Sequence, residues 1–265
     1  MHYAKRSLGQ NYLTDLNILK KIVSLTKIYS KDILEIGPGK GALTDQILKY
    51  KPKSLILIEK DDNLSKELRI KYAKNKKITI FNKDVLKFDL EKRLKENSII
   101  FGNLPYNISS QILVKIIKFK KWPPKYSDVI FMFQKELAER IIGKFNTSKY
   151  GRLSILTNYR LKTLYKFNVS PNCFFPKPQV NSTVIYFKPN KKILGKIKNI
   201  ENLEKITNVL FSNKRKMINK AISKLFKDPG LLSQKLNINL SLRPDQLSGN
   251  DFYRIVEYYE KYKKI

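Results

Sequence analysis

A glycine-rich loop is the first segment whose residue types and spacing indicate chemistry. The segment 37–41 (GPGKG) follows the apolar stretch 32–36, and a helical pattern begins at Ala42. Glycines let the backbone turn tightly and approach a ligand without a Cβ clash, and the first turn of a helix offers unpaired N–H groups. The spacing of Gly37, Gly39 and Ala42 also fits the dinucleotide-binding fingerprint with its permitted final alanine. The loop therefore predicts a nucleotide-like ligand and leaves the kind of nucleotide open.

Two carboxylates follow at the ends of the next two apolar stretches. Glu59 closes the stretch 54–59, 59 − 37 = 22 residues after the first glycine, where an acid can accept hydrogen bonds from both ribose hydroxyls. Asp84 follows the stretch 77–82, where a carboxylate can accept a hydrogen bond from an adenine amine. One such acid alone is more often a solvated loop residue. Both acids at successive strand ends, beside the glycine loop, predict an adenosine pocket.

The segment 103–110 (NLPYNISS) follows the fourth apolar stretch, on the ligand side of an open parallel sheet. As structure alone it is a proline-containing turn that leads into a capped helix. As chemistry, the side-chain oxygen of Asn103 and the backbone carbonyl of Leu104 can accept both hydrogens of a planar amine and turn its lone pair toward a methyl donor. Tyr106 can stack on the base and hold it in line. The segment favours a methyltransferase that needs no strong general base.

These residues require a sheet that brings the ends of several strands together. Apolar stretches of strand length alternate with helical patterns at 32–36, 54–59, 77–82, 98–102, 127–133, 160–167 and 180–187. A helix is predicted at 109–119, with Ser109 or Ser110 as its cap. This alternation predicts an α/β fold with a doubly wound, mostly parallel sheet and helices on both faces. Only helical patterns follow from about residue 190, which predicts two domains, 1–189 and 190–265.

The composition excludes several classes of protein. The chain has 265 residues, of which 42% are hydrophobic, and 54 Lys and Arg against 22 Asp and Glu give a formal charge of +32. The only cysteine is Cys173 and the only histidine is His2, which excludes an intrachain disulfide, a cysteine-rich metal site and a catalytic triad in the core. No apolar stretch approaches the ~20 residues that span a bilayer, and no signal core follows Met1. We expect a cytoplasmic protein without a metal.

The excess of basic residues favours a polyanionic partner, with nucleic acid ahead of an acidic membrane. Residues 191–227 hold eleven Lys and Arg against two acids, and a helix with an apolar stripe that includes Met217 is predicted within them. Its basic face consists of Lys216, Lys220, Lys224 and Lys227. A solvated face or a helix on a membrane surface gives the same pattern. We expect phosphate contacts with RNA, because the same chain carries a base-modifying site.

In their joint order, these motifs resemble the ribosomal RNA small-subunit adenine dimethyltransferases (the KsgA type), which are class I S-adenosylmethionine-dependent enzymes. The resemblance covers nearly all 265 residues. The segments that carry it are 7–13 (SLGQNYL), 35–41 (EIGPGKG), Glu59, Asp84, 103–109 (NLPYNIS), 134–136 (QKE), 150–154 (YGRLS), 174–182 (FFPKPQVNS) and 213–216 (NKRK). Where the family usually has a Pro-Pro-Pro-Lys-Val-Asp-Ser-like run, this chain has 176–182 (PKPQVNS). This departure lies in the loop after Phe174, outside the cofactor pocket.

The resemblance implies a class I methyltransferase (Rossmann-like) domain in residues 1–189 and a small, all-helical, basic RNA-binding domain in residues 190–265. It implies S-adenosyl-L-methionine as cofactor, with contacts from Asn11, Leu13, Gly37, Glu59, Asp84 and Asn103. It also implies that the target adenine is held and oriented by Asn103, Leu104, Tyr106 and Phe174. In this last set, Phe174 is the second stacking face.

The implied reaction is dimethylation of the exocyclic amines of two adjacent adenosines in small-subunit (16S) rRNA during ribosome biogenesis. The base must enter the pocket unpaired or flipped out of its stack. We expect the partner to be rRNA in an immature small ribosomal subunit. We expect the enzyme to act as a monomer, without membrane or metal.

Three other functions share part of this pattern. A large-subunit rRNA adenine methyltransferase of the antibiotic-resistance type has the same adenosine pocket, but residues 150–154 and the basic tail resemble the small-subunit enzymes more. An NAD-type oxidoreductase uses a similar glycine loop, but residues 103–106 and the lack of a core histidine argue against it. A non-enzymatic nucleic-acid binder derived from the same scaffold would not need an intact pocket.

Overall fold

A computed structural model describes residues 11–191 and 197–262. The chain forms two compact units. The first unit takes the chain up to Ala138 and again Thr163–Pro189, and the second takes Glu139–Lys162 and the chain from Asn190 onward. In the described ranges, no helix is both long enough and apolar enough to cross a membrane.

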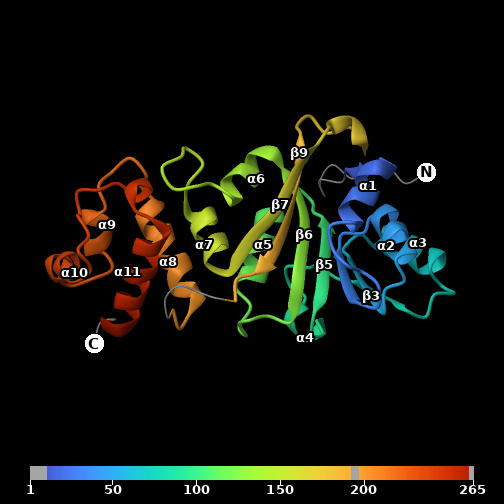
Figure 1. Ribbon diagram of the computed structural model, residues 1–265, viewed down its shortest axis with the longest axis horizontal. Helices are drawn as coiled ribbons and strands as arrows, with labels where there is room; N and C mark the ends of the chain where they lie inside the picture. The colour runs from blue at the N-terminus through green and yellow to red at the C-terminus, as the bar shows by residue number, and fades with distance from the viewer. Residues whose placement is uncertain (1–10, 192–196, 263–265) are drawn as a thin grey trace. The chain divides into compact units, whose positions relative to one another are not determined.

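A seven-stranded sheet forms the centre of the first unit (Figure 1), in the order β4-β3-β2-β5-β6-β9-β7. Its strands are β2 (Asp32–Ile36), β3 (Ser54–Glu59), β4 (Ile78–Asn82), β5 (Ser98–Asn103), β6 (Tyr126–Gln134), β7 (Leu161–Val169) and β9 (Ser182–Pro189). The pairs from β4 to β6 are parallel, and β9 runs antiparallel to β6. The predicted α/β fold with its mostly parallel sheet is confirmed. Every strand predicted from an apolar stretch is present. The central strands β5 and β6 are buried along nearly their whole length, as is typical of a sheet covered on both faces.

Helices cover both faces of this sheet. They are α1 (Leu16–Val23), α2 (Ala42–Lys49), α3 (Asp62–Lys71), α4 (Leu90–Arg93), α5 (Ser109–Ile117) and α6 (Lys135–Ile141). Figure 1 shows α1, α2 and α3 on one face and α5 on the other. Alternate strand residues such as Ile33, Leu55 and Ile99 pack in one cluster with α1 and α2, while their neighbours Leu34 and Ile100 are buried toward the opposite face.

Helix α5 begins differently from the prediction, which placed a serine cap at its start. The N-cap position is Ile108, and no side chain caps the helix there. The hydroxyl of Ser109 instead donates to the carbonyl of Tyr106 at 3.2 Å. The serine therefore braces the turn before the helix, because its hydroxyl reaches back to that turn.

A separate two-stranded ribbon joins distant parts of the first unit. Strand β1 (Tyr12–Leu13) pairs antiparallel with β8 (Phe174–Phe175), with Tyr12 opposite Phe175 and Leu13 opposite Phe174. The amides of Thr14 and Asp15 both donate to the carbonyl of Cys173, at 2.9 and 3.3 Å. The ribbon ties the start of the described chain to the 3-10 turn Pro171–Cys173 that precedes β8.

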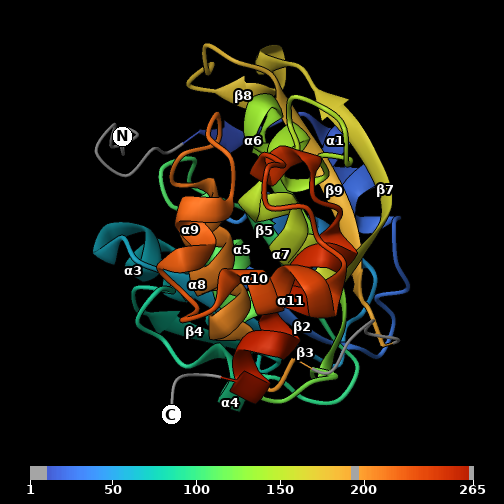
Figure 2. The same cartoon turned by 90° about the vertical axis from the view of Figure 1, so that its left-hand side faces the viewer.

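The second unit is helical and includes a segment that the predicted boundary assigned to the first domain. Its helices are α7 (Arg152–Arg160), α8 (Ile200–Phe211), α9 (Asn219–Ser223), α10 (Pro229–Leu236) and α11 (Gly249–Tyr262), with a 3-10 turn at Pro244–Gln246. Helix α7 packs on α8 and α11 (Figure 2). The hydroxyl of Tyr253 donates to the carbonyl of Ile155 at 3.2 Å, and Tyr150 donates to Leu247 at 3.0 Å. These contacts are why residues 139–162 belong to the helical unit.

The single helix predicted within residues 216–227 is wrong. Only α9 is helical there, and Met217, predicted in the apolar stripe, is 55% exposed. The amides of Ile218 and Asn219 donate to the carbonyls of Leu242 and Leu240, at 2.9 and 3.2 Å, so the chain before α9 pairs with another segment instead of continuing a helix. The predicted basic residues are all exposed at this place: Lys216, Lys220, Lys224 and Lys227.

Candidate cofactor and adenine site

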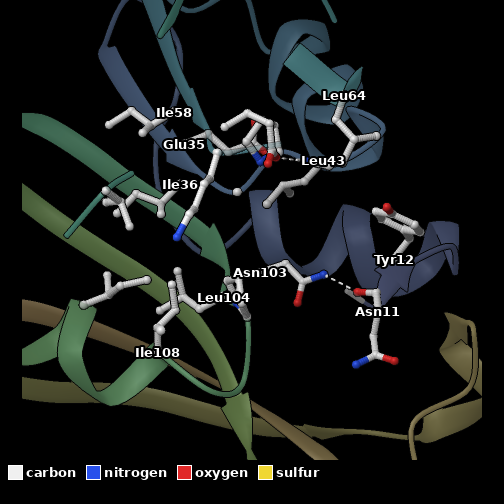
Figure 3. A pocket seen from close by; sticks show the side chains of 18 of the residues that line it. Asn11, Tyr12, Glu35, Ile36, Leu43, Ile58, Leu64, Asn103, Leu104 and Ile108 are labelled. Carbon is white, nitrogen blue, oxygen red and sulfur yellow. Dashed lines mark hydrogen bonds between the residues drawn. The ribbon is translucent and has the colours of Figure 1, made fainter. Parts of the chain in front are cut away.

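A cavity of about 200 Å³ lies at the carboxyl ends of β2 to β5 in the first unit (Figure 3). Its wall is largely apolar and contains every predicted cofactor contact, namely Asn11, Leu13, Gly37, Glu59, Asp84 and Asn103. It also contains three of the four predicted adenine contacts: Asn103, Leu104 and Tyr106. An open α/β sheet binds ligands at this edge, so the fold gathers the predicted residues where chemistry is expected.

The glycine loop leaves bare backbone on one side of the cavity. Gly39 has φ +59°, and a Cβ built on it would lie 3.0 Å from two carbons of the Tyr12 ring. The positive φ disfavours any side chain, and the ring leaves no room for one. The amide of Gly37 donates to the carbonyl of Ile58 at 2.9 Å, which fixes the loop to β3. The loop and the start of α2 are therefore shaped for close approach of a ligand.

Glu59 is buried, with 7% of its surface exposed, and its carboxylate is held by the backbone. Its Oε2 accepts from the amide of Gly39 at 3.1 Å, and its Oε1 accepts from the amide of Asp61 at 2.9 Å. Burial raises the pKa of Glu59, and these hydrogen bonds oppose that rise. Each oxygen keeps a further lone pair. The carboxylate can accept hydrogen bonds from a pair of hydroxyls, as predicted for a ribose.

Asp84 is held by its own turn and by a lysine. Its Oδ1 accepts from the amide of Leu86 at 2.9 Å, and its Oδ2 pairs with the Nζ of Lys60 at 2.9 Å. The hydrogen bond from Lys60 lowers the pKa of Asp84. From α5, the Nζ of Lys115 donates to the carbonyl of Leu86 at 2.6 Å. The sequence predicted Asp84 but not these two lysines, because nothing in their spacing links them to it.

The side-chain amide of Asn103 has a defined direction. Its Nδ2 donates to the backbone carbonyl of Asn11 at 3.1 Å (Figure 3). In the part of the chain that the structure describes, no group donates to its Oδ1. Because an amide that donates through nitrogen presents its oxygen elsewhere, Oδ1 is an acceptor available to a ligand. This is the orientation that accepting an amine hydrogen requires.

Tyr106 is fixed through its hydroxyl, which shares a 2.7 Å hydrogen bond with the Oγ of Ser182 at the start of β9. Burial raises the pKa of Tyr106, so its phenol stays protonated at neutral pH. The ring is thus available as a neutral flat surface and not as a base. Leu104 is buried beside it in the same turn.

Phe174, the predicted second stacking face, does not line the cavity. Its side chain is 4% exposed and lies in the hydrophobic core, opposite Leu13 on the buried face of the two-stranded ribbon. The next residue, Phe175, is 71% exposed. The pleat explains the difference, because successive side chains on a strand point to opposite faces. The position of the ribbon against the core could not be predicted from the motif, because it depends on tertiary packing.

Glu35 is a site residue that sequence reasoning assigned no role. It lies in the cavity wall, is 1% exposed, and accepts a hydrogen bond from the hydroxyl of Thr44 at 2.6 Å. Burial raises the pKa of Glu35 to about 8. The sequence contains a signal for this residue, because Glu35 lies between Leu34 and Ile36 in a strand that is otherwise apolar after Asp32. Within the described ranges, no group of three or more His, Cys, Asp or Glu side chains is placed to hold a metal.

Comparison with known proteins shows which family the chain belongs to. The family described as "Ribosomal RNA adenine dimethylase" matches residues 1–261. This chain belongs to that family. It is similar to "Ribosomal RNA small subunit methyltransferase A" of Pelagibacter ubique, with 43% identity over 97% of each chain. The protein of the same name from Francisella tularensis subsp. novicida is 38% identical over 96% of this chain and 97% of its own.

Solved structures agree with this assignment. A dimethyladenosine transferase from Plasmodium falciparum is similar with a TM-score of 0.79 and 26% identity, over 94% of this chain and 97% of the other. The 23S rRNA methyltransferase ErmE, with a TM-score of 0.66 and 21% identity over 94% of this chain and 99% of its own, shows the shared fold alone. The dimethylase family, the class I fold and dependence on S-adenosylmethionine are confirmed, and the oxidoreductase alternative is excluded.

Proposed function

We propose that this dimethylase transfers methyl groups from S-adenosyl-L-methionine to the exocyclic amines of two adjacent adenosines in small-subunit (16S) rRNA, during ribosome biogenesis. The observation that carries the proposal is the amide of Asn103, which donates to the carbonyl of Asn11 and leaves its Oδ1 available at the strand ends. Family membership and the small-subunit relatives support the choice of rRNA and of the subunit.

The residues of the cavity fit the cofactor by their donor and acceptor chemistry. Glu59 would accept from the two ribose hydroxyls, and Asp84 from the adenine amine. The backbone of Asn11, Leu13 and Gly37 would line the remainder of the cofactor, beside a loop in which a Cβ at Gly39 would meet the Tyr12 ring at 3.0 Å. When bound, the cofactor supplies an electrophilic methyl group on a positively charged sulfur.

The target amine would be oriented by this chain's own acceptors. Oδ1 of Asn103 and the backbone carbonyl of Leu104 accept its two hydrogens, so the nitrogen lone pair points out of the base plane. Tyr106 stacks on the ring, and its hydroxyl stays anchored to Ser182. Once the nitrogen has been methylated it becomes acidic and releases its proton toward the acceptors and solvent, so no strong base is required. Catalysis comes from orientation, which can supply much of the barrier reduction.

The basic surface of the second unit would bind the rRNA substrate. Exposed lysines of the second unit, with Lys216, Lys220 and Lys224 among them, would contact rRNA phosphates and position the substrate without reading its sequence. The enzyme acts as a monomer, in the cytoplasm where ribosomal subunits are assembled, and needs no metal.

The test is the methylation state of rRNA in cells that lack the protein. We expect two adjacent adenosines of the small-subunit rRNA to lose their dimethylation, as mapped by mass spectrometry of rRNA fragments. The wild-type gene restores it and Asn103→Ala does not. Loss of methylation at large-subunit rRNA, with the small-subunit adenosines unchanged, would contradict the proposal and favour the antibiotic-resistance type of activity.

A further inference from the structure

The loop between β8 and β9, residues 176–181, is fixed at both ends to walls of the cavity. At its start, Phe175 pairs with Tyr12 in the two-stranded ribbon. At its end, Ser182 shares the 2.7 Å hydrogen bond with the hydroxyl of Tyr106, and the carbonyl of Asn181 accepts from the amide of Lys135 at 2.9 Å. The loop therefore runs from the cofactor side of the cavity to the side where the target base is proposed to lie.

Phe175 stands on the outward face of the ribbon. Residues directly opposite in an antiparallel pair have side chains on the same face, so Phe175 shares a face with Tyr12 while Leu13 and Phe174 occupy the buried one. The ring of Tyr12 lies against Gly39 in the cavity wall. An aromatic side chain that is 71% exposed is thus held directly beside that wall.

The surroundings of Phe175 match nucleic acid by charge. Lys177, two residues along the loop, is exposed, and so is Lys40, whose Nζ lies 5.3 Å from the centre of the Tyr12 ring. Proteins that bind single-stranded nucleic acid combine exposed aromatic rings with basic residues, since the rings stack on bases and the basic side chains meet phosphates. An apolar protein partner would gain nothing from these charges. A substrate strand that reaches the cavity also has to pass its rim.

We infer that Phe175 is a substrate-positioning residue that stacks on the base of a nucleotide next to the target adenosine. This inference rests on the proposed function and deepens it, because it adds a second contact for the same RNA strand outside the pocket for the target base. The stacked neighbour would hold the strand unpaired at the rim and leave the target base free to enter. The residue touches neither the cofactor nor the reacting nitrogen, so its loss should weaken RNA binding alone.

The test compares three substitutions by steady-state methylation of purified immature small subunits. Phe175→Ala and Phe175→Leu remove the flat ring, and Leu keeps an apolar side chain of similar size. We expect both to raise the KM for the particle by about 5- to 150-fold, the loss of one base–aromatic stack, with unchanged kcat. Phe175→Tyr keeps the ring and should keep the wild-type KM. Affinity for S-adenosylmethionine, measured by calorimetry, should be the same in all three and verifies that the fold is intact.

A matched control is Tyr29→Ala, which removes a similarly exposed ring (73% exposed). Tyr29 lies in the loop before β2, at the amino end of that strand, whereas the cavity lies at the carboxyl ends. It should leave KM and kcat unchanged. The inference is overturned if Phe175→Leu behaves like wild type, or if kcat falls while KM does not change. Wild-type protein that methylates no small-subunit particle would instead refute the proposed function. The two failures are distinguishable, because the inference is tested on the Phe175 variants and the proposed function on the wild-type protein.

Discussion

The cavity and the basic surface of the second unit hold their polar side chains in opposite ways. In the cavity, Glu59 and Asp84 accept from backbone amides and Asn103 is tied to the carbonyl of Asn11. On the second unit, Lys216 and Lys220 are exposed, and no side chain in the described ranges pairs with the ammonium group of either lysine. Catalysis in a preorganised site depends on individual atoms, whereas RNA binding by a charged surface is the sum of many weak phosphate contacts. One substitution should therefore disable the first and only weaken the second.

The largest effect is expected at Asn103. Asn103→Ala removes the oriented Oδ1, so methyl transfer should fall by at least about a hundredfold, as expected when a reacting group loses its alignment. RNA affinity, measured by filter binding on the same preparation, should stay nearly unchanged. Asn250→Ala, an exposed asparagine on α11, is the control and should retain full activity. Retained turnover in Asn103→Ala would remove the amine-orienting mechanism.

A smaller effect is expected at Glu59. Glu59→Ala removes a charged acceptor from the cavity, which should cost on the order of 1.5–3 kcal/mol in cofactor binding, roughly a 10- to 150-fold weaker affinity for S-adenosylmethionine. Calorimetry measures it. Glu67→Ala removes an exposed acid from α3, the helix that follows Glu59, and should leave the affinity unchanged. If the wild-type protein bound NADH and not S-adenosylmethionine, the cofactor assignment would fail.

The strands that carry this cavity could be predicted because each is a short, mostly apolar run, and β2, β3 and β5 are largely buried. The stretches predicted at 32–36 and 54–59 are β2 and β3 at the same residues, and the other strands of the sheet differ by one or two residues at their ends. The two-residue strands β1 and β8 could not be predicted, since two residues show no periodicity. Their pairing depends on contacts between residues 12–13 and 174–175, far apart in the chain.

Site residues could be predicted where a motif lies at the end of a strand. They could not be predicted where tertiary packing determines the direction of the side chain. Gly37, Glu59 and Asn103 sit at strand ends, so the fold alone brings them together. The role predicted for Phe174, as a second stacking face in the cavity, does not match the structure, because the ribbon turns its side chain into the core. The helix predicted through Met217 failed because pairing of Ile218 and Asn219 with residues 240–242 outweighs local helical pattern.

A pH-dependent effect on stability separates the buried Glu35 of the cavity from the solvated charges elsewhere. Burial raises the pKa of Glu35 from 4.5 to about 8. Between these values the folded protein keeps a proton that the unfolded chain releases, so the stabilisation is complete below about pH 4.5 and is lost as pH rises through about 8. The free energy of unfolding should fall with pH, relative to Glu35→Gln, by at most about 1.4 kcal/mol per pH unit. Denaturant titrations of both proteins, at about pH 5, 7 and 9, measure this difference. A difference that does not change with pH would contradict it.

The smallest effect per residue is expected at the exposed lysines. Replacing Lys216, Lys220, Lys224 and Lys227 with Gln should reduce the log–log salt slope of RNA binding by roughly 0.7–0.9 for each lost phosphate contact. Cofactor affinity should not change, because these residues belong to the second unit. Methylation should fall through weaker substrate binding, and lower salt should restore it. An unchanged salt slope would mean that these lysines are only a solvated surface.

The central claim is tested most directly by methyl transfer to purified ribosomal particles. Immature small subunits and large subunits, both from cells lacking the protein, are incubated with the wild-type enzyme and isotopically labelled S-adenosylmethionine, and the rRNA is analysed by mass spectrometry. We predict dimethyladenosine at two adjacent positions of the small-subunit rRNA and no label in the large-subunit rRNA. Label in the large-subunit rRNA alone, or binding of the cofactor without transfer to either particle, would contradict the assignment.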